Sequence, residues 1–226
     1  MVRLFDAATE TVGELIPATG RILRIAAGDG VRVAVVADLL RRVAERQRWR
    51  TGVAGHSSLT DRQLLYLNVH PFQDPATAVE LVVHVDGDPP AVSGRSVQVA
   101  PLLVDGVDPL DAPAGVDPLA LRLALLRLPY RETALFTPDA VAAADGDLKR
   151  WRALVADWAE QPSAAMLGVA VVIARIEDDL DLPGALVALD QLAADTSITP
   201  GARFEAFAHL DRLLGLDLAA DVGRRR

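Results

Sequence analysis

The chain has no cysteine, a single lysine (Lys149) and few aromatic side chains, which make up 4% of its 226 residues. The lack of cysteine excludes disulfides, thiol catalysis and thiolate metal sites. Because aromatic residues are scarce, valine, leucine and alanine must fill the core of a chain that is 51% hydrophobic. We therefore expect one large domain or two small ones, folded without help from an oxidising compartment.

Long apolar runs are also missing. No run approaches the roughly 20 residues that a membrane helix needs, and the apolar stretch at residues 164–174 is predicted to be a buried helix. The first six residues lack the pattern of a signal peptide because they are few and already charged. These absences predict a cytoplasmic protein with no membrane segment.

The formal net charge is −8, whereas a nucleic-acid-binding domain usually carries a basic face that neutralises phosphates. One local basic patch remains as an alternative, because five arginines gather near the end of a predicted helix: Arg41, Arg42, Arg46, Arg48 and Arg50. We interpret them as a solvated helix face whose cations lie near the negative end of the helix dipole. Nucleic acid is therefore an unlikely partner.

The first half of the chain predicts alternating strands and a helix. Strands are expected at residues 3–6 and 21–27, and a helix at 31–50 follows the turn Gly28-Asp29-Gly30. A strand, a glycine turn and a helix form the first half of a Rossmann-type unit. Further strands are predicted at residues 79–86 and 97–105, and residues 68–75 and 107–115 are expected to be loops.

The second half is predicted to be entirely helical. Proline follows an N-capping residue at Asp117-Pro118, Thr137-Pro138 and Thr199-Pro200, and it opens further helices at Pro162 and Leu182-Pro183. Apolar residues recur every three or four positions in each segment. The fold class is therefore α/β plus all-α: a Rossmann-type parallel sheet domain at residues 1–115, followed by an α-helical bundle domain at residues 116–226.

Two stretches of the second half carry a family resemblance: G-V-D-P-L-A-L-R-L-A-L-L at residues 115–126 and E-D-D-L-D-L-P-G-A-L at residues 177–186. They resemble the region after the catalytic domain of cysteinyl-tRNA synthetases, and more closely the actinobacterial cysteine:glucosaminyl-inositol ligases of mycothiol synthesis. The resemblance is good over residues 116–192 and moderate at residues 3–6 and 38–43. It implies a degenerate, truncated relative with a class I synthetase-like sheet domain.

The resemblance also implies adenylate chemistry whose signatures are missing from this chain. That family places two histidines in an H-x-G-H turn at a helix N-terminus, a lysine- and serine-containing loop over the triphosphate, and a zinc ion on cysteine thiolates. Here Ala27-Gly28-Asp29-Gly30 stands at the histidine turn, residues 107–115 contain neither lysine nor serine, and cysteine is absent. ATP is thus a cofactor by resemblance only, and we expect no catalytic residue and no metal site.

Four residues are candidates for ligand binding. Gly28, Asp29 and Gly30 could cradle a phosphate or a ribose, although an ordinary tight turn is the simpler interpretation. His70 lies within residues 68–75, which weakly match the family's N-V-T-D-V-D-D-P strand end, and we expect it at a strand end over the crevice of the sheet.

Several other polar clusters have simpler structural interpretations. His56, Ser57, Ser58 and Asp61 suggest a turn or helix cap more than a catalytic set, and His84 suggests a paired strand residue. The acidic residues Asp178, Asp179 and Asp181 suggest a helix end and an N-cap. Trp151 and Trp158 lie seven residues apart and are expected to pack in the core.

These observations lead to three hypotheses of different classes. The first is a non-catalytic, synthetase-like paralogue that binds or regulates through protein–protein contacts, as a homo-oligomer or with a full-length relative. The second is a residual ATP-dependent ligase that forms an aminoacyl-adenylate from a small amino acid. The third is a tRNA-binding accessory module.

Overall fold

The computed structural model describes residues 2–16, 21–55, 57–73, 79–85 and 94–224. Its first half forms a four-stranded parallel sheet with the strand order β4-β3-β5-β6. The strands are β3 (Ile22–Ala27), β4 (Arg50–Ala54), β5 (Leu81–Val85) and β6 (Arg95–Val99), and helix α1 (Val31–Arg46) connects β3 to β4. A parallel sheet followed by helices confirms the predicted fold class.

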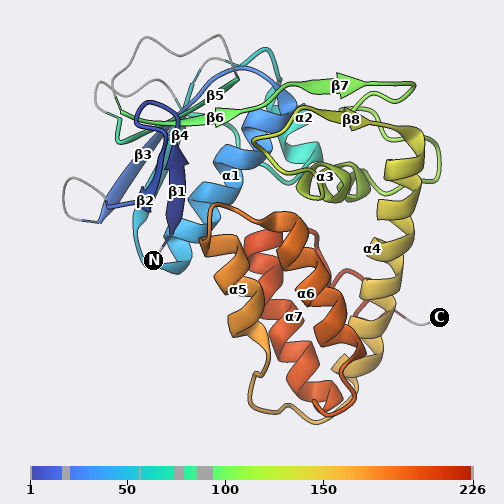
Figure 1. Ribbon diagram of the computed structural model, residues 1–226. Helices are drawn as coiled ribbons and strands as arrows, with labels where there is room; N and C mark the ends of the chain where they lie inside the picture. The colour runs from blue at the N-terminus through green and yellow to red at the C-terminus, as the bar shows by residue number, and fades with distance from the viewer. Residues whose placement is uncertain (1, 17–20, 56, 74–78, 86–93, 225–226) are drawn as a thin grey trace.

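Helix α1 lies between the sheet and the helices of the second half (Figure 1). It is buried along most of its length, including Val33, Leu40 and Val43, because it packs against the strands on one side and against other helices on the other. Strand β3 alternates buried and half-buried residues, whereas β5 is buried from Leu81 to His84. Continuous burial of β5 is expected for an inner strand of a parallel sheet.

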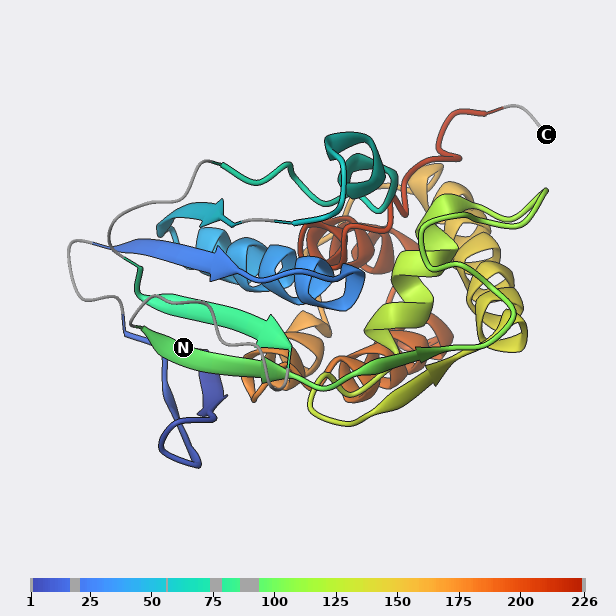
Figure 2. The ribbon, with the colours of Figure 1, turned by 90° about the horizontal axis from the view of Figure 1, so that it is seen from above.

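An antiparallel hairpin of β1 (Arg3–Asp6) and β2 (Thr11–Glu14) lies beyond β6, at the edge of the sheet opposite β4 (Figure 2). The Arg95 guanidinium donates hydrogen bonds to the Leu4 and Glu14 carbonyl oxygens, both at 2.7 Å. Strand β1 confirms the prediction for residues 3–6, and β2 was not predicted.

The second half contains helices α3 (Pro118–Leu126), α4 (Pro138–Ala159), α5 (Val169–Glu177), α6 (Leu182–Ala194) and α7 (Pro200–Leu214). Side chains cap three of them as the sequence predicts: Asp117 accepts from Leu119 N, Thr137 from Ala140 N and Asp181 from Gly184 N. Trp151 and Trp158 are buried in the core.

The prediction that everything after residue 117 is helical is wrong. Strand β8 (Ala134–Phe136) pairs in parallel with β7 (Leu102–Val104) across the predicted domain boundary. The predicted strand at 97–105 is in fact β6 and β7, interrupted at Ala100 and Pro101. Short strands of three residues carry too little periodicity to be recognised in the sequence. The division at residues 115/116 remains a prediction.

Other differences lie at element ends. Helix α1 ends at Arg46 rather than at residue 50. Strand β4 and helix α2 (Asp61–Tyr66) follow it in a region for which no strand and no helix bounds were predicted. Helix α5 begins at Val169 rather than near Pro162, because Gly168 takes a left-handed conformation with φ 78° that ends the preceding extended segment. No helix within the described residues is long and apolar enough to cross a membrane.

Candidate functional site

The carboxyl end of β3 is the point where the order of the sheet reverses. Strand β4 follows β3 in the chain and lies on one side of it, whereas β5 lies on the other side. In open parallel sheets ligands bind outside the carboxyl ends of the strands at such a switch point. The turn Gly28-Asp29-Gly30 directly follows β3, as the sequence predicts, and therefore lies at this switch point.

The turn is shaped by its two glycines. The Gly28 amide donates to the Val83 carbonyl oxygen at 2.8 Å, which draws the turn against β5. Gly30 caps α1 with φ 108°, a conformation that disfavours residues with a side chain. The first helical amides of α1 therefore face the carboxyl end of the sheet, where a helix dipole favours an anion.

Asp29 supplies that anion from the chain itself. Its Oδ1 atom accepts hydrogen bonds from the Gly30 amide at 2.8 Å, and from both the amide and the hydroxyl of Ser58 at 2.8 Å. The Ser57 hydroxyl adds a longer bond at 3.3 Å. Partial burial acts to raise the pKa of Asp29, but the hydrogen bonds from Ser58, Gly30 and Ser57 hold it below its ordinary value. The side chain is therefore a carboxylate at neutral pH.

Close packing brings the two serines to Asp29. A Cβ atom added to Gly55 would lie only 2.0 Å from the Ala27 carbonyl oxygen, so only glycine fits there. The chain after β4 therefore passes directly against the end of β3. This approach places Ser57 and Ser58 beside the turn, confirming a turn role for these serines. His56 lies outside the described residues.

The turn does not fit a triphosphate. A second anion beside the Asp29 carboxylate would meet like-charge repulsion, and both Ser58 donors already hold Asp29. Arg32, in the first turn of α1, is a cation near this end of the sheet, but it is buried and directs its Nη atoms to the carbonyl oxygens of Ala100, Pro129 and Glu132. Burial lowers the pKa of Arg32. Its guanidinium donates to carbonyl groups of two loops, and these bonds occupy the Nη donors that a ligand at the turn would need.

His70 lies elsewhere. It is exposed and lines a cavity of about 420 Å³ at the β4 edge of the sheet, together with Arg41, Glu45, Thr51 and Gln73. None of the three turn residues lines this cavity. The structure thus does not bring His70 together with the Gly28–Gly30 turn, and ligand binding by either remains a prediction.

His84 is closer to the turn than His70. The backbone of His84 packs against Gly28, and its ring is buried between two partners. Nδ1 lies 2.9 Å from the Val85 carbonyl oxygen and Nε2 lies 2.7 Å from the Ser96 hydroxyl. A neutral ring that donates from Nδ1 and accepts at Nε2 satisfies both contacts. His84 is thus a paired strand residue, as the sequence predicts.

A network of buried charge joins α1 to the second half. Arg122 on α3 is fully buried and donates from Nη2 to Asp38 Oδ2 at 2.8 Å, and from Nε to the Leu214 carbonyl oxygen at 2.7 Å. Arg41 and Arg42 also bind Asp38, each at 2.7 Å. Burial acts to raise the pKa of Asp38, but Arg122, Arg42 and Arg41 hold it below its ordinary value. Two of the five clustered arginines are thus turned inward.

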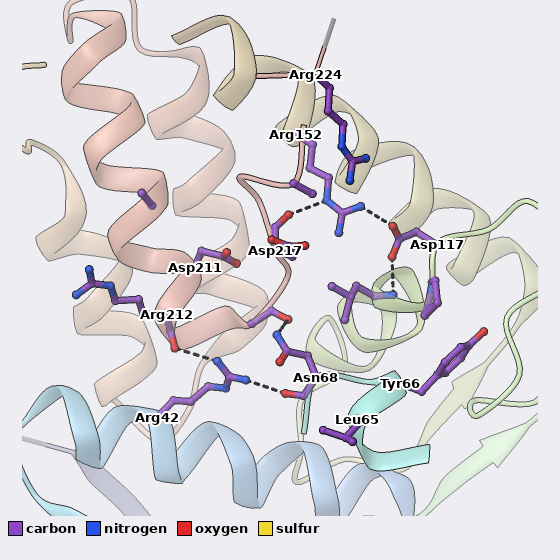
Figure 3. Close-up of a pocket in the computed structure, with 15 residues that line it drawn as sticks. Arg42, Leu65, Tyr66, Asn68, Asp117, Arg152, Asp211, Arg212, Asp217 and Arg224 are labelled. Carbon is purple, nitrogen blue, oxygen red and sulfur yellow. Dashed lines mark hydrogen bonds and ion pairs between the residues drawn. The ribbon is translucent and has the colours of Figure 1, made fainter. Parts of the chain in front are cut away.

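Above this network lies a cavity of about 750 Å³ that the sequence did not reveal (Figure 3). Arg152 of α4 crosses its upper wall and donates to Asp117 Oδ2 and to the Leu216 and Asp217 carbonyl oxygens. Asp211 of α7 accepts the Leu216 amide at 2.8 Å and the Leu218 amide at 3.0 Å. These groups serve mainly to hold the segment after α7. The sequence signal for the turn that borders this cavity is Gly215, which ends α7 in a left-handed conformation with φ 66°.

The acidic cluster is structural. Asp179 accepts the Tyr130 hydroxyl at 2.6 Å and the Phe5 amide at 2.7 Å, and Asp181 caps α6. Burial and the hydrogen bond to Asp179 raise the pKa of Tyr130 well above its usual range. In the part of the chain that the structure describes, no three acidic, histidine or cysteine residues are grouped so that they could hold a metal ion.

Known proteins resemble part of this chain. An L-cysteine:1D-myo-inositol 2-amino-2-deoxy-alpha-D-glucopyranoside ligase from Thermobispora bispora is 46% identical over 105 residues, which cover 45% of this chain and 25% of that protein. The ligase of the same name from Stackebrandtia nassauensis is 40% identical over 118 residues, covering 50% of this chain and 26% of that protein. The one from Acidothermus cellulolyticus is 39% identical over 105 residues, covering 46% and 26%.

No family model matches the chain. The chain spans about a quarter of the length of the curated relatives it matches. The predicted resemblance is confirmed: over nearly half of its length this protein is a relative of the cysteine:glucosaminyl-inositol ligases.

Proposed function

We propose that this chain is a non-catalytic relative of those ligases that acts as a binding or regulatory protein. The observation that carries the proposal is Asp29. At the helix N-terminus where the resembled family handles phosphate, this chain places its own carboxylate and binds it with the Gly30 and Ser58 amides and the Ser58 hydroxyl. A site that is already satisfied by an internal anion is poorly suited to adenylate formation.

Exposed apolar side chains support a role in protein–protein contacts. Leu103 on β7 and Leu135 on β8 are direct register partners, and they are 54% and 51% exposed. Parallel strands are normally covered on both faces, and a strand edge without a partner can pair with another chain. The β7–β8 pair is therefore a surface that a protein partner could cover.

The charge distribution favours a protein partner over tRNA. Arg41 and Arg42 bind Asp38 inside the fold, and Arg46 pairs with Glu177 at 3.1 Å. The basic patch anticipated at the end of α1 is thus largely neutralised, which weakens the counterion-release term that nucleic-acid binding needs. A tRNA-binding module remains the third candidate, and a residual adenylating ligase remains the second.

Measurement of amino-acid-dependent exchange between ATP and pyrophosphate tests the proposal. We expect no exchange above background with cysteine or any other amino acid, and no rise in the melting temperature with ATP, because a ligand that prefers the folded state must raise it. Exchange above background would establish the ligase alternative. A salt-dependent mobility shift of tRNA would establish the third candidate.

The variant Asp29→Asn sharpens this test. The amide keeps the size of the side chain and one acceptor oxygen but removes the negative charge. A melting-temperature rise with ATP in this variant, absent from the parent chain, would show that the carboxylate alone closes the site. Ser58→Ala, which leaves the charge in place, is the matched control and should show no rise.

A further inference from the structure

The two edges of the parallel sheet differ. At the β6 edge the β1–β2 hairpin covers the sheet: the Ala7 amide donates to the Ser96 carbonyl oxygen at 3.0 Å, and Arg95 binds two carbonyl groups of the hairpin. At the β4 edge (Figure 2), the described residues contribute a single bridge, in which the Gln73 amide donates to the Val53 carbonyl oxygen at 2.8 Å. Within the described part of the chain, most of the β4 edge is therefore unpaired.

The register of β4 identifies the unpaired backbone groups. The Arg50 amide donates to the Arg21 carbonyl oxygen at 2.8 Å, so Arg50 faces β3, and so does Gly52, because successive residues of a strand direct their backbone groups to alternate edges. Thr51 and Val53 lie between and after these residues and face outward. Apart from the Val53 carbonyl oxygen, their amide and carbonyl groups have no backbone partner among the described residues.

A cavity of about 420 Å³ opens beside these backbone groups, within the range of about 300–1,000 Å³ that ligand pockets occupy. Thr51, Gly52 and Val53 of β4 line it, and so do His70 and Pro71 of the segment that leads to the bridge. Neighbouring strands of a sheet lie about 4.8 Å apart. An extended chain that enters this cavity can therefore reach the unpaired groups of β4.

The topology of the sheet sets the direction of such a chain. In the Rossmann order, a further parallel strand lies on the outer side of the strand that corresponds to β4. The bridge between Ala54 and Gln73 is itself parallel, and it is the only pairing that the described residues make on this side of β4. An added strand that continues this bridge therefore runs parallel to β4. Its main-chain hydrogen bonds supply the affinity, as they do where a peptide extends a sheet.

Two side chains of α1 line the same cavity. Glu45 accepts a hydrogen bond from the Thr51 hydroxyl at 2.8 Å and pairs with Arg41 at 2.7 Å. Each of these charges already has a partner, so this wall selects neither an anionic nor a cationic ligand. A peptide side chain that faces α1 meets polar groups there, which favours a hydrogen-bonding side chain over an apolar one.

We propose that the β4 edge binds an extended segment of a partner protein as an added parallel strand, held by the outward backbone groups of Thr51 and Val53. The inference names the chemistry of the partner for the proposed binding role and rests on that role. It also has readouts of its own, because amide exchange and peptide binding are measured without ATP, amino acid or tRNA.

Exchange of single backbone amides with deuterated solvent, followed by NMR on the full chain, tests whether the edge is open. We expect the Thr51 amide to exchange at least about tenfold faster than the Gly52 amide, which faces β3, because an unpaired amide exchanges without opening of the sheet. A Thr51 amide as protected as that of Gly52 would overturn the proposal, since the donor would then already have a partner.

Peptides selected from a phage-displayed library of random sequences serve as the ligand probe. We expect selected peptides to bind the full chain and to slow exchange of the Thr51 amide. Thr51→Pro removes the outward amide and leaves the ladder to β3 intact, since proline is tolerated on an edge strand, so it should weaken binding at least about tenfold. Thr51→Val is the matched control: it keeps the amide, loses only the hydroxyl, and should bind as the parent chain does.

A change in the peptide gives a second, independent measurement on the unaltered protein. N-methylation of the peptide amides that face β4 should also weaken binding at least about tenfold, because it removes main-chain donors and leaves the side chains in place. A library that yields no binding peptide would overturn the proposal. So would peptides that Thr51→Pro binds as tightly as the parent chain does, since their site would lie elsewhere. Adenylation activity in a chain that binds peptides at this edge would instead refute only the non-catalytic role.

Discussion

Two aspartates nine positions apart, Asp29 before α1 and Asp38 within it, show how burial separates two regions of this molecule. Both have pKa values below the ordinary one, but from different partners: hydroxyl and amide groups around Asp29, three arginines around Asp38. Asp29 is exposed at the end of the sheet, whereas Asp38 is 1% exposed at the junction with the helices. We therefore expect the carboxyl end of β3 to tolerate substitution better than the junction.

The difference has consequences for function. The junction holds fully buried Arg122 and ties α1 to α3 and to the end of α7. Residues of the sheet and of all five later helices also share one buried apolar cluster. Any binding role is thus carried on a scaffold in which the two predicted halves pack together.

The largest loss in the free energy of unfolding is expected from Arg122→Leu. The variant leaves Asp38 with two arginines and removes the donors to the Leu214 and Leu67 carbonyl oxygens. Breaking a buried pair by removing one partner costs about 3–5 kcal/mol. We expect a loss of this size in the free energy of unfolding measured with urea, with exposed Arg62→Leu as the control near zero. A loss below about 1 kcal/mol would mean that the junction is not held by this pair.

A smaller change in the free energy of unfolding, one that depends on pH, is expected from Asp211→Asn. Burial raises the pKa of Asp211, which is bound by the Leu216 and Leu218 amides. A raised folded pKa in an acid means that stability is complete below the unfolded value and falls as the pH rises through the folded value. The asparagine variant has no carboxyl group at this position, so its stability lacks this fall.

Urea unfolding of Asp211→Asn at several pH values checks this sign. At pH about 3 the variant should be the less stable, since an amide offers one acceptor oxygen to two amides. Towards pH about 7 the difference should narrow by about 1.4 kcal/mol for each unit by which the pKa is raised. A difference that widens with pH would show that the carboxylate is stabilised, as at Asp38.

The smallest loss of stability is expected from Asp29→Ala. Its lowered folded pKa means that the carboxylate stabilises the fold above the unfolded pKa and that this contribution disappears as the pH falls through the folded value. Because the group is exposed, solvent screening limits the contribution to less than about 1 kcal/mol. Thermal unfolding at neutral and acidic pH should show a small deficit that vanishes in acid. A deficit as large as that of Arg122→Leu would remove the contrast between the two regions.

The sequence anticipated the elements with strong local signals. The strand at residues 21–27, the turn at Gly28–Gly30, helices α4, α6 and α7, and the family resemblance were all recognised from proline positions, periodicity and motifs, although Thr199 makes no side-chain cap bond to α7. Strand β2 was not predicted, and β7 and β8 were merged or missed because three residues show no clear period. His70 was expected over the crevice, but its cavity lies at the β4 edge.

Local chemistry thus determined which residues form most helices and strands and where most caps stand, and the composition determined that the chain has no thiol. Only the tertiary structure decided that Ser58 turns to Asp29, that Asp38 meets Arg122 across 84 positions of sequence, and that α5 leaves Val171 in solvent. The physical reason is that caps and periodicity act over a few neighbouring residues, whereas burial and long-range ion pairs depend on which surfaces the whole chain packs together.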